Sequence, residues 1–178
     1  MELEALKGWE NFYVITGSAA AGLTGLTFVV IALVRDAQRT APTGVSAFLT
    51  PTIVHFTVVL SLAAFLCVPR LPARALEIGL SAVGLGGLAY VLLITHWIVN
   101  RLEGYLPVLE DWTFNVALPG AAYSGVLGAG LELDRRPELA LDVVAGSVLL
   151  LLLIGIHNAW DIAVWMSLHK AQDPQKPP

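Results

Sequence analysis

The sequence has little charge, a single cysteine and no run of basic residues, and each of these shortages excludes a class of protein. Only 13% of its 178 residues are charged, about half the share found in an average soluble domain. The lone cysteine, Cys67, excludes a disulfide within the chain. Acidic residues outnumber basic ones by fourteen to ten, giving a net charge of -4. Without a basic patch, nucleic acid is not an expected partner.

Motifs that carry familiar catalytic chemistry are also missing. The sequence contains no His-Glu-x-x-His helix, no Gly-x-Ser-x-Gly turn and no Cys-x-x-Cys pair. The glycine-rich segment 84–87 does not fit a nucleotide-binding loop, because it lies inside an apolar stretch with no strand before it. We therefore expect that the chain is not an enzyme, and no cofactor, metal ion or reaction follows from the sequence.

Apolar residues, by contrast, make up 56% of the chain and give it a mean hydropathy of +0.72. A helix needs about 20 such residues to cross the ~30 Å hydrocarbon layer of a bilayer. Five apolar stretches reach this length, so we predict an all-α fold, a single domain over residues 1–178 built as a bundle of five transmembrane helices. The predicted spans are residues 9–34, 46–68, 73–99, 112–131 and 141–168, and the proline-rich tail 171–178 is predicted to be disordered.

The predicted topology places the two ends of the chain on opposite sides of the membrane. The start of the chain lacks the basic segment of a secretory signal, so the first span is expected to be retained. Lysine and arginine are shared equally between the two faces, and the positive-inside rule therefore does not select an orientation. The lipid bilayer is the one partner that the composition indicates.

Small residues recur four positions apart in three of the predicted spans, which places them on one face of each helix. Such a face lets a neighbouring backbone approach closely, either within the monomer or between the subunits of a homo-oligomer. Both alternatives remain open at this point. The three stripes are Gly17, Ala21 and Gly25; Gly120, Ser124 and Gly128; and Gly155, Ala159 and Ala163.

Polar residues inside the spans are the stronger indication of function, because placing them in hydrocarbon is costly. In the fifth span, His157, Asn158 and Asp161 share one helix face. The carboxylate of Asp161 needs a partner or water, and His157 is the nearest candidate. We predict that this pair faces the bundle interior or a cavity, together with Asn115 from the fourth span.

The second span adds Thr52 and His55 to the candidate site. Both residues follow Pro51 in the sequence. Proline has no backbone N–H to donate, so one carbonyl of this helix is left free to bind something. Weaker candidates lie near span ends, where solvation by lipid headgroups would account for them: His96, Asn100 and Asn115. Because successive spans alternate in direction, these residues fall in the same half of the bilayer, which indicates a water-accessible vestibule or ligand site.

Three functions fit this pattern. The first, which we rank highest, is a small homo-oligomeric channel or transporter with Asp161, His157, Asn158, His55 and Thr52 along the path of an ion or ligand. The second is an accessory or structural membrane subunit whose small-residue faces bind a partner helix. The third is a membrane protein that binds metal through His55, His157 and Asp161, or haem between the two histidines.

Two short motifs stand near the ends of the chain. Trp9-x-x-Phe12-Tyr13 is followed by Leu-Thr-Gly-Leu-x-Phe-Val at 23–29, and the last span contains Asn-Ala-Trp-Asp at 158–161. In both motifs the chain resembles small bacterial polytopic membrane proteins that are uncharacterised. The resemblance implies the bacterial cytoplasmic membrane as the location, and it implies no activity or ligand.

Overall fold

The computed structural model describes residues 4–37, 43–101 and 109–170, and the regular structure of these residues is all helical. Five long helical rods follow a short 3-10 turn, η1 (Glu4–Leu6), which confirms the predicted helix number and order. The predicted tail 171–178 lies outside the described residues. The rods are α1 (Glu10–Ala37), α2 (Thr43–Leu66), α3 (Ala73–Arg101), a composite fourth rod and α6 (Pro137–Lys170).

The fourth rod is interrupted by a π-helical turn that the sequence analysis did not predict. It consists of α4 (Leu109–Trp112), the π turn η2 (Thr113–Ala117) and α5 (Leu118–Glu132), which follow one another without a break. The backbone N–H of Leu118 bonds to the carbonyl of Thr113, five residues earlier. Pro119 has no N–H to continue the regular pattern, so the wider turn lies directly before a proline that disturbs the helix.

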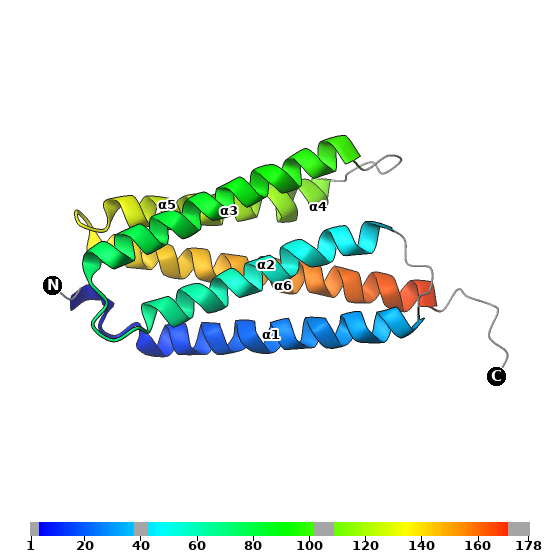
Figure 1. The fold of residues 1–178 in the computed structure, drawn as a ribbon, viewed down its shortest axis with the longest axis horizontal. Coiled ribbons are helices and arrows are strands. Elements are labelled where there is room, and N and C mark those ends of the chain that lie inside the picture. Colours follow the sequence, from blue (N-terminus) through cyan, green and yellow to red (C-terminus); the bar gives the residue numbers. More distant parts are fainter. Residues whose placement is uncertain (1–3, 38–42, 102–108, 171–178) are drawn as a thin grey trace.

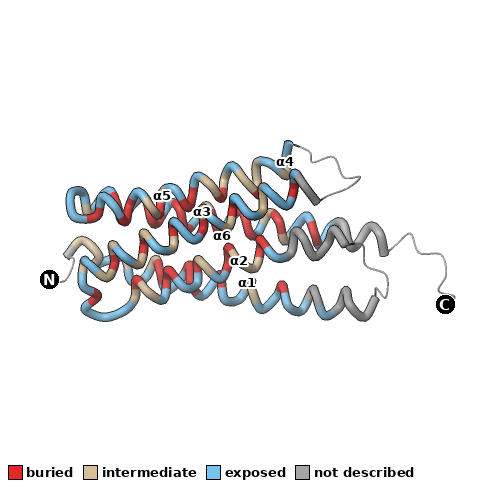
Figure 2. Tube along the Cα trace, turned by 45° about the horizontal axis from the view of Figure 1, so that its top comes forward, coloured by how far each residue is buried: buried red, intermediate tan, exposed pale blue. Residues whose placement is uncertain are grey.

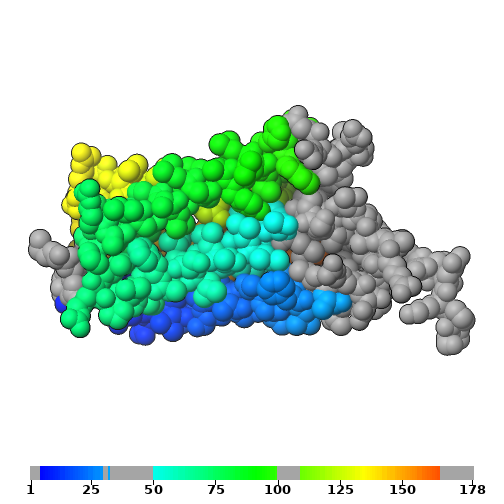
Figure 3. Space-filling view, in the orientation of Figure 1, coloured from blue at the N-terminus to red at the C-terminus, as the bar shows by residue number. Residues whose placement is uncertain are grey.

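The rods run up and down the long axis, so η1 and the end of α6 lie at opposite ends of the bundle (Figure 1). α5 packs against both α3 and α6, and α2 packs against both α6 and α1. The middle of the bundle is therefore formed by α2, α5 and α6. On one broad face of the molecule, α1, α2 and α3 are visible side by side (Figure 3).

Figure 2 shows that every helix has exposed positions on its outer side, and many of the residues at these positions are large and apolar. In α3, only 17% of the apolar segment is buried, and Leu92 is 70% exposed. A large exposed apolar surface is unfavourable in water and suits lipid chains. Within the part of the chain that the structure describes, three helices are long and apolar enough to cross a membrane, and one shorter apolar helix accompanies them: Glu10–Val29, Ala73–Val99 and Pro137–Val164, with Thr50–Leu66 as the shorter one.

Threonine hydroxyls within the helices are satisfied without help from solvent. Each donates to the carbonyl four residues earlier at 2.8 or 2.9 Å, a bond that hides the polar hydrogen in the helix itself. This arrangement agrees with lipid surroundings, in which a free hydroxyl would be costly. The threonines are Thr16, Thr24, Thr27, Thr57, Thr95 and Thr113.

The closest approach between helices occurs where glycines of α3 and α5 cross. A Cβ atom at Gly84 would lie 2.6 Å from the backbone nitrogen of Leu127, and one at Gly130 would lie 2.8 Å from the backbone nitrogen of Ser81. Gly87 faces the ring of Tyr123. The absence of side chains at these positions therefore allows the two backbones to meet.

The predicted small-residue stripes contribute less to this packing than expected. Gly17 lies against Ala63, and Gly155 lies against the ring of Phe56. The remaining stripe positions are exposed or only half-buried, and a Cβ at any of their glycines would meet nothing within 4 Å. They are Ala21, Gly25, Gly120, Ser124, Gly128, Ala159 and Ala163. Packing within the monomer therefore uses only part of the first and third stripes, since helical spacing defines a face but not the direction in which it turns.

The glycine crossing leads to a first testable expectation, for which α3 provides its own control. We expect Gly84→Ala to destabilise the protein by about 1–3 kcal/mol, because the new methyl group would collide with the backbone of α5. Gly86 is exposed and has open space around it. Gly86→Ala should stabilise the helix by up to about 1 kcal/mol. Thermal unfolding in detergent compares the two, and equal melting temperatures would contradict the close crossing.

Candidate functional site

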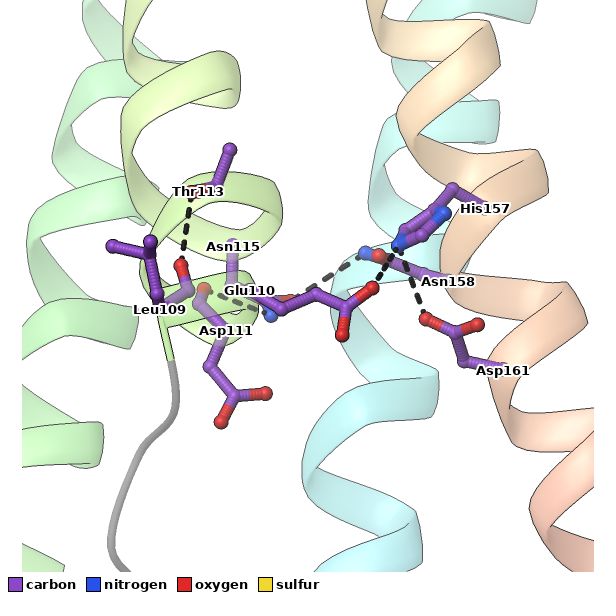
Figure 4. Close-up of polar contacts among 8 residues, drawn as sticks. All are labelled: Leu109, Glu110, Asp111, Thr113, Asn115, His157, Asn158 and Asp161. Atoms are coloured by element: carbon purple, nitrogen blue, oxygen red, sulfur yellow. Dashed lines mark hydrogen bonds and ion pairs between the residues drawn. The ribbon is translucent and has the colours of Figure 1, made fainter.

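The predicted polar residues of the last helix meet the start of the fourth rod at one end of the bundle. There, α4 and η2 lie beside α6, and side chains from both point into the space between them (Figure 4). Three contacts join the two elements: an ion-pair cluster, a stacked pair of rings and an amide–amide hydrogen bond.

The ion-pair cluster has the imidazole of His157 at its centre. Its Nε2 atom lies 3.1 Å from Oδ2 of Asp161, one turn along α6, and 3.4 Å from Oε1 of Glu110 in α4. The carboxylate side chains are 51% and 62% exposed, whereas that of His157 is only 28% exposed. Within the described residues, no group is in hydrogen-bonding geometry with the buried Nε2. The nitrogen is therefore close to two acceptors without donating to either.

The orientation of the His157 ring is fixed by Phe114. The two rings are stacked, with centroids 3.6 Å apart and planes at 21° to each other. Phe114 follows Glu110 by four positions, so the aromatic ring and the carboxylate lie on neighbouring turns of the same rod. The ring of Phe114 thus covers one face of the imidazole, and Nε2 lies beside the two carboxylates.

A buried pair of asparagines lies next to this cluster. Nδ2 of Asn158 donates to Oδ1 of Asn115 at 3.4 Å, and Nδ2 of Asn115 donates to the carbonyl of Asp111 at 3.1 Å. Both side chains are buried, as predicted for Asn115. The bond ties η2 to α6, and it leaves neither amide nitrogen without an acceptor.

The π turn accounts for the way in which the fourth rod presents three side chains to α6. In a regular helix, Glu110 and Phe114 share a face, while Asn115 is turned away from Glu110 by its spacing of five. A π-helical turn is closed by bonds between residues five apart, so it brings positions with this spacing closer to one face. The π turn thereby allows the side chains of Glu110, Phe114 and Asn115 all to reach α6.

The structure answers the sequence-based expectations for this region residue by residue. The expected pairing of Asp161 with His157 is confirmed by their 3.1 Å contact. Asp161 was expected to face the bundle interior or a cavity, and its side chain is half exposed while its carboxylate contacts His157. His96 is exposed, near the end of α3, and the side chain of Asn100 lies outside the described residues.

His55 belongs to a second polar group, buried between α2, α3 and α5. Its Nδ1 lies 2.9 Å from the hydroxyl of Tyr123, and its ring is perpendicular to that of Tyr90 with centroids 6.4 Å apart. His55 is 1% exposed, and Thr52, one turn earlier, is fully buried. Among the described residues, nothing bonds to the buried hydroxyl of Tyr90.

The proposed ligand sets for metal and haem change accordingly. Among the described residues, the ligand atoms of Glu110, His157 and Asp161 lie together, so Glu110 takes the place that the sequence analysis gave to His55. The two histidines also have different partners: Tyr123 for His55, and Phe114 with Glu110 for His157. The interpretation of these histidines as a facing pair of haem ligands is therefore not supported by their contacts.

Glu110, Phe114, Tyr90 and Tyr123 were missed by the sequence analysis. One signal was present, since two acidic residues directly precede the fourth span. Their contact with the last helix crosses a separation of 47 residues between Glu110 and His157 and depends on the π turn, which no periodicity in the sequence reveals.

Comparisons with known proteins do not add to this description. No protein-family model, no curated protein and no solved structure matches the chain. The resemblance to small bacterial membrane proteins therefore stays a prediction, and the function has to be argued from the residues themselves.

The buried tyrosines provide a matched pair of variants for the second polar group. We expect Tyr123→Phe to destabilise the protein by about 1 kcal/mol, because it removes the hydroxyl that bonds to the buried His55. Tyr90→Phe removes a hydroxyl that has no partner in the described structure, so it should be neutral or stabilising. Chemical unfolding of both variants in the same detergent would test this, and a larger loss for Tyr90→Phe would contradict the assigned bond.

Proposed function

We propose that the protein is a small cation channel or transporter in which all five rods cross the membrane. Its mouth is formed by Glu110, His157 and Asp161. The observation that carries the proposal is the position of the His157 nitrogen between carboxylates of two different helices at one end of an apolar bundle.

Charge and exposure support this role. The two carboxylate side chains are more than half exposed, and Asp161 lies close to the end of the candidate span Pro137–Val164, where the headgroup region admits water, while the surrounding helix surfaces are apolar. A cluster of negative charge beside low-dielectric walls raises the local concentration of cations. Acidic side chains at the mouth of a pore are a common basis of cation selection.

Buried polar groups beyond the mouth supply further contacts for a passing ion. The Asn115–Asn158 pair lies next to the cluster, and the His55–Tyr123 pair lies in the core. Both pairs are formed between helices, so a small relative movement of these helices would free their oxygen and nitrogen atoms. Intramembrane polar groups of this kind mark ion pathways in many membrane proteins.

The outward-facing small residues support assembly of more than one copy. Ala21 and Gly25 on α1, and Ser124 and Gly128 on α5, are exposed with open space around their glycines. Close helix contacts in membranes use such residues, so we include a homo-oligomer in the proposal. The same surface favours an accessory subunit as the second candidate function. We also propose the bacterial cytoplasmic membrane as its location, and the resemblance of the end motifs is the support for this part of the proposal.

Cation flux into liposomes containing the purified protein tests the function. We expect Asp161→Asn to lower the flux roughly tenfold, because it removes one of two negative charges at the mouth. Glu138→Gln makes the same change of charge at the opposite end of α6 and serves as the control. Equal flux in wild type and Asp161→Asn, or none in either, would contradict the proposal.

The proposed assembly is tested by Gly25→Leu. Within the monomer the new side chain meets open space, so the helical content and the folded monomer should be retained. At a contact between subunits it would interfere by about 1–3 kcal/mol and shift the protein towards the monomer. Mass determination in detergent reports the difference, and an unchanged oligomer would exclude this face from the contact.

A further inference from the structure

We infer that Glu110, His157 and Asp161 bind a divalent first-row transition-metal ion. The inference deepens the proposed function and rests on it for the role of the ion as the transported species. The binding itself is argued from the three side chains alone. Their ligand atoms, one imidazole nitrogen and two carboxylate oxygens, all lie within 4.8 Å of one another.

The distances between the ligand atoms suit such an ion. Bonds from Zn²⁺ to nitrogen and oxygen are about 2.0–2.2 Å long, which separates neighbouring ligands of a tetrahedron by about 3.3–3.6 Å. The contacts from Nε2 of His157 to the two carboxylates are 3.1 and 3.4 Å. Only a small outward movement of the exposed carboxylates is needed to admit the ion.

The geometry at Nε2 separates this site from an ordinary ion pair. A protonated imidazole between two carboxylates is expected to donate a hydrogen bond to one of them. Here the buried nitrogen lies 3.1 Å from one carboxylate and 3.4 Å from the other, and among the described residues it is in hydrogen-bonding geometry with neither. This is the arrangement expected of a nitrogen that offers its lone pair to a cation shared with the carboxylates.

Ligand type and charge select the class of metal. Imidazole suits zinc and its transition-metal neighbours, whereas magnesium and calcium favour sites made of oxygen alone. With a neutral histidine, the two carboxylates supply a charge of -2, which matches a divalent ion. The stacked ring of Phe114 holds the imidazole in place, as the surroundings of metal ligands commonly do.

The number of ligands indicates an exchangeable ion rather than a structural one. Structural zinc sites have four protein ligands and are closed, whereas three protein ligands leave a position for water or another group. Glu110 and Asp161 are more than half exposed, so the remaining position is open to solvent. An ion that arrives from water and leaves again requires this kind of site.

Binding is tested by calorimetric titration of the purified full-length protein in detergent with Zn²⁺. We expect one strong site per chain and a rise in melting temperature with added Zn²⁺. Glu110→Gln and Asp161→Asn should each weaken binding at least about tenfold, because both retain shape and remove a ligand charge. Both side chains are more than half exposed, so the two variants should remain folded, which circular dichroism checks. Glu138→Gln, with its carboxylate at the far end of α6, should bind like wild type.

Acidification adds a readout that does not depend on substitution. Zn²⁺ binding should weaken as the pH falls, because protons compete for the imidazole and the carboxylates. Undiminished binding in both carboxylate variants, or no binding by the wild type, would overturn the metal site. The flux measurement separates the two proposals: binding of Zn²⁺ without cation flux overturns the transport function alone, while flux without binding overturns the metal site alone.

Discussion

Polar groups between these helices have to find their partners on their own backbone or on the next helix, because the outer surface of the bundle is apolar. Threonines do the former, bonding to carbonyls one turn back. Side chains that bond to the next helix fix the positions of the helices: His55 joins α2 to α5 through Tyr123, and Asn158 joins α6 to η2 through Asn115. In lipid, where apolar side chains gain little by meeting each other, such bonds and close packing decide how helices associate.

The fourth rod satisfies this constraint differently along its two parts. In α5, glycine crossings let the backbone of α3 approach, and the interaction is mainly one of shape. In α4 and η2, the π turn redirects side chains towards α6, and the interaction is mainly polar. A π turn weakens the regular hydrogen-bond pattern and persists when it is of use elsewhere. In this protein, the π turn is useful because it allows Glu110, Phe114 and Asn115 to contact α6.

The number and order of the helices could be predicted from the apolar stretches, because span length and helix-ending prolines are local properties of the sequence. The contact between His157 and Asp161 was predictable for the same reason, because residues four apart on a helix are neighbours. The partner of His55 could not be predicted in this way. Tyr123 lies 68 positions away, and the distance between the two side chains depends on how α2 and α5 pack. Gly25 shows a further limit: its spacing was read correctly, but its face turns outward.

The proposed cation site would have to meet two opposing demands on an ion that enters a membrane protein. Deep burial would strengthen the attraction between the ion and the carboxylates, but it would require both to lose their water, at a cost of several kcal/mol for each charge. Full exposure would avoid this cost and leave little binding. The side chains of Glu110 and Asp161 are more than half exposed, while His157 is held against Phe114 and its nitrogen is buried. The site therefore combines a fixed, partly dehydrated ligand with two solvated charges, which favours capture of a cation without trapping it.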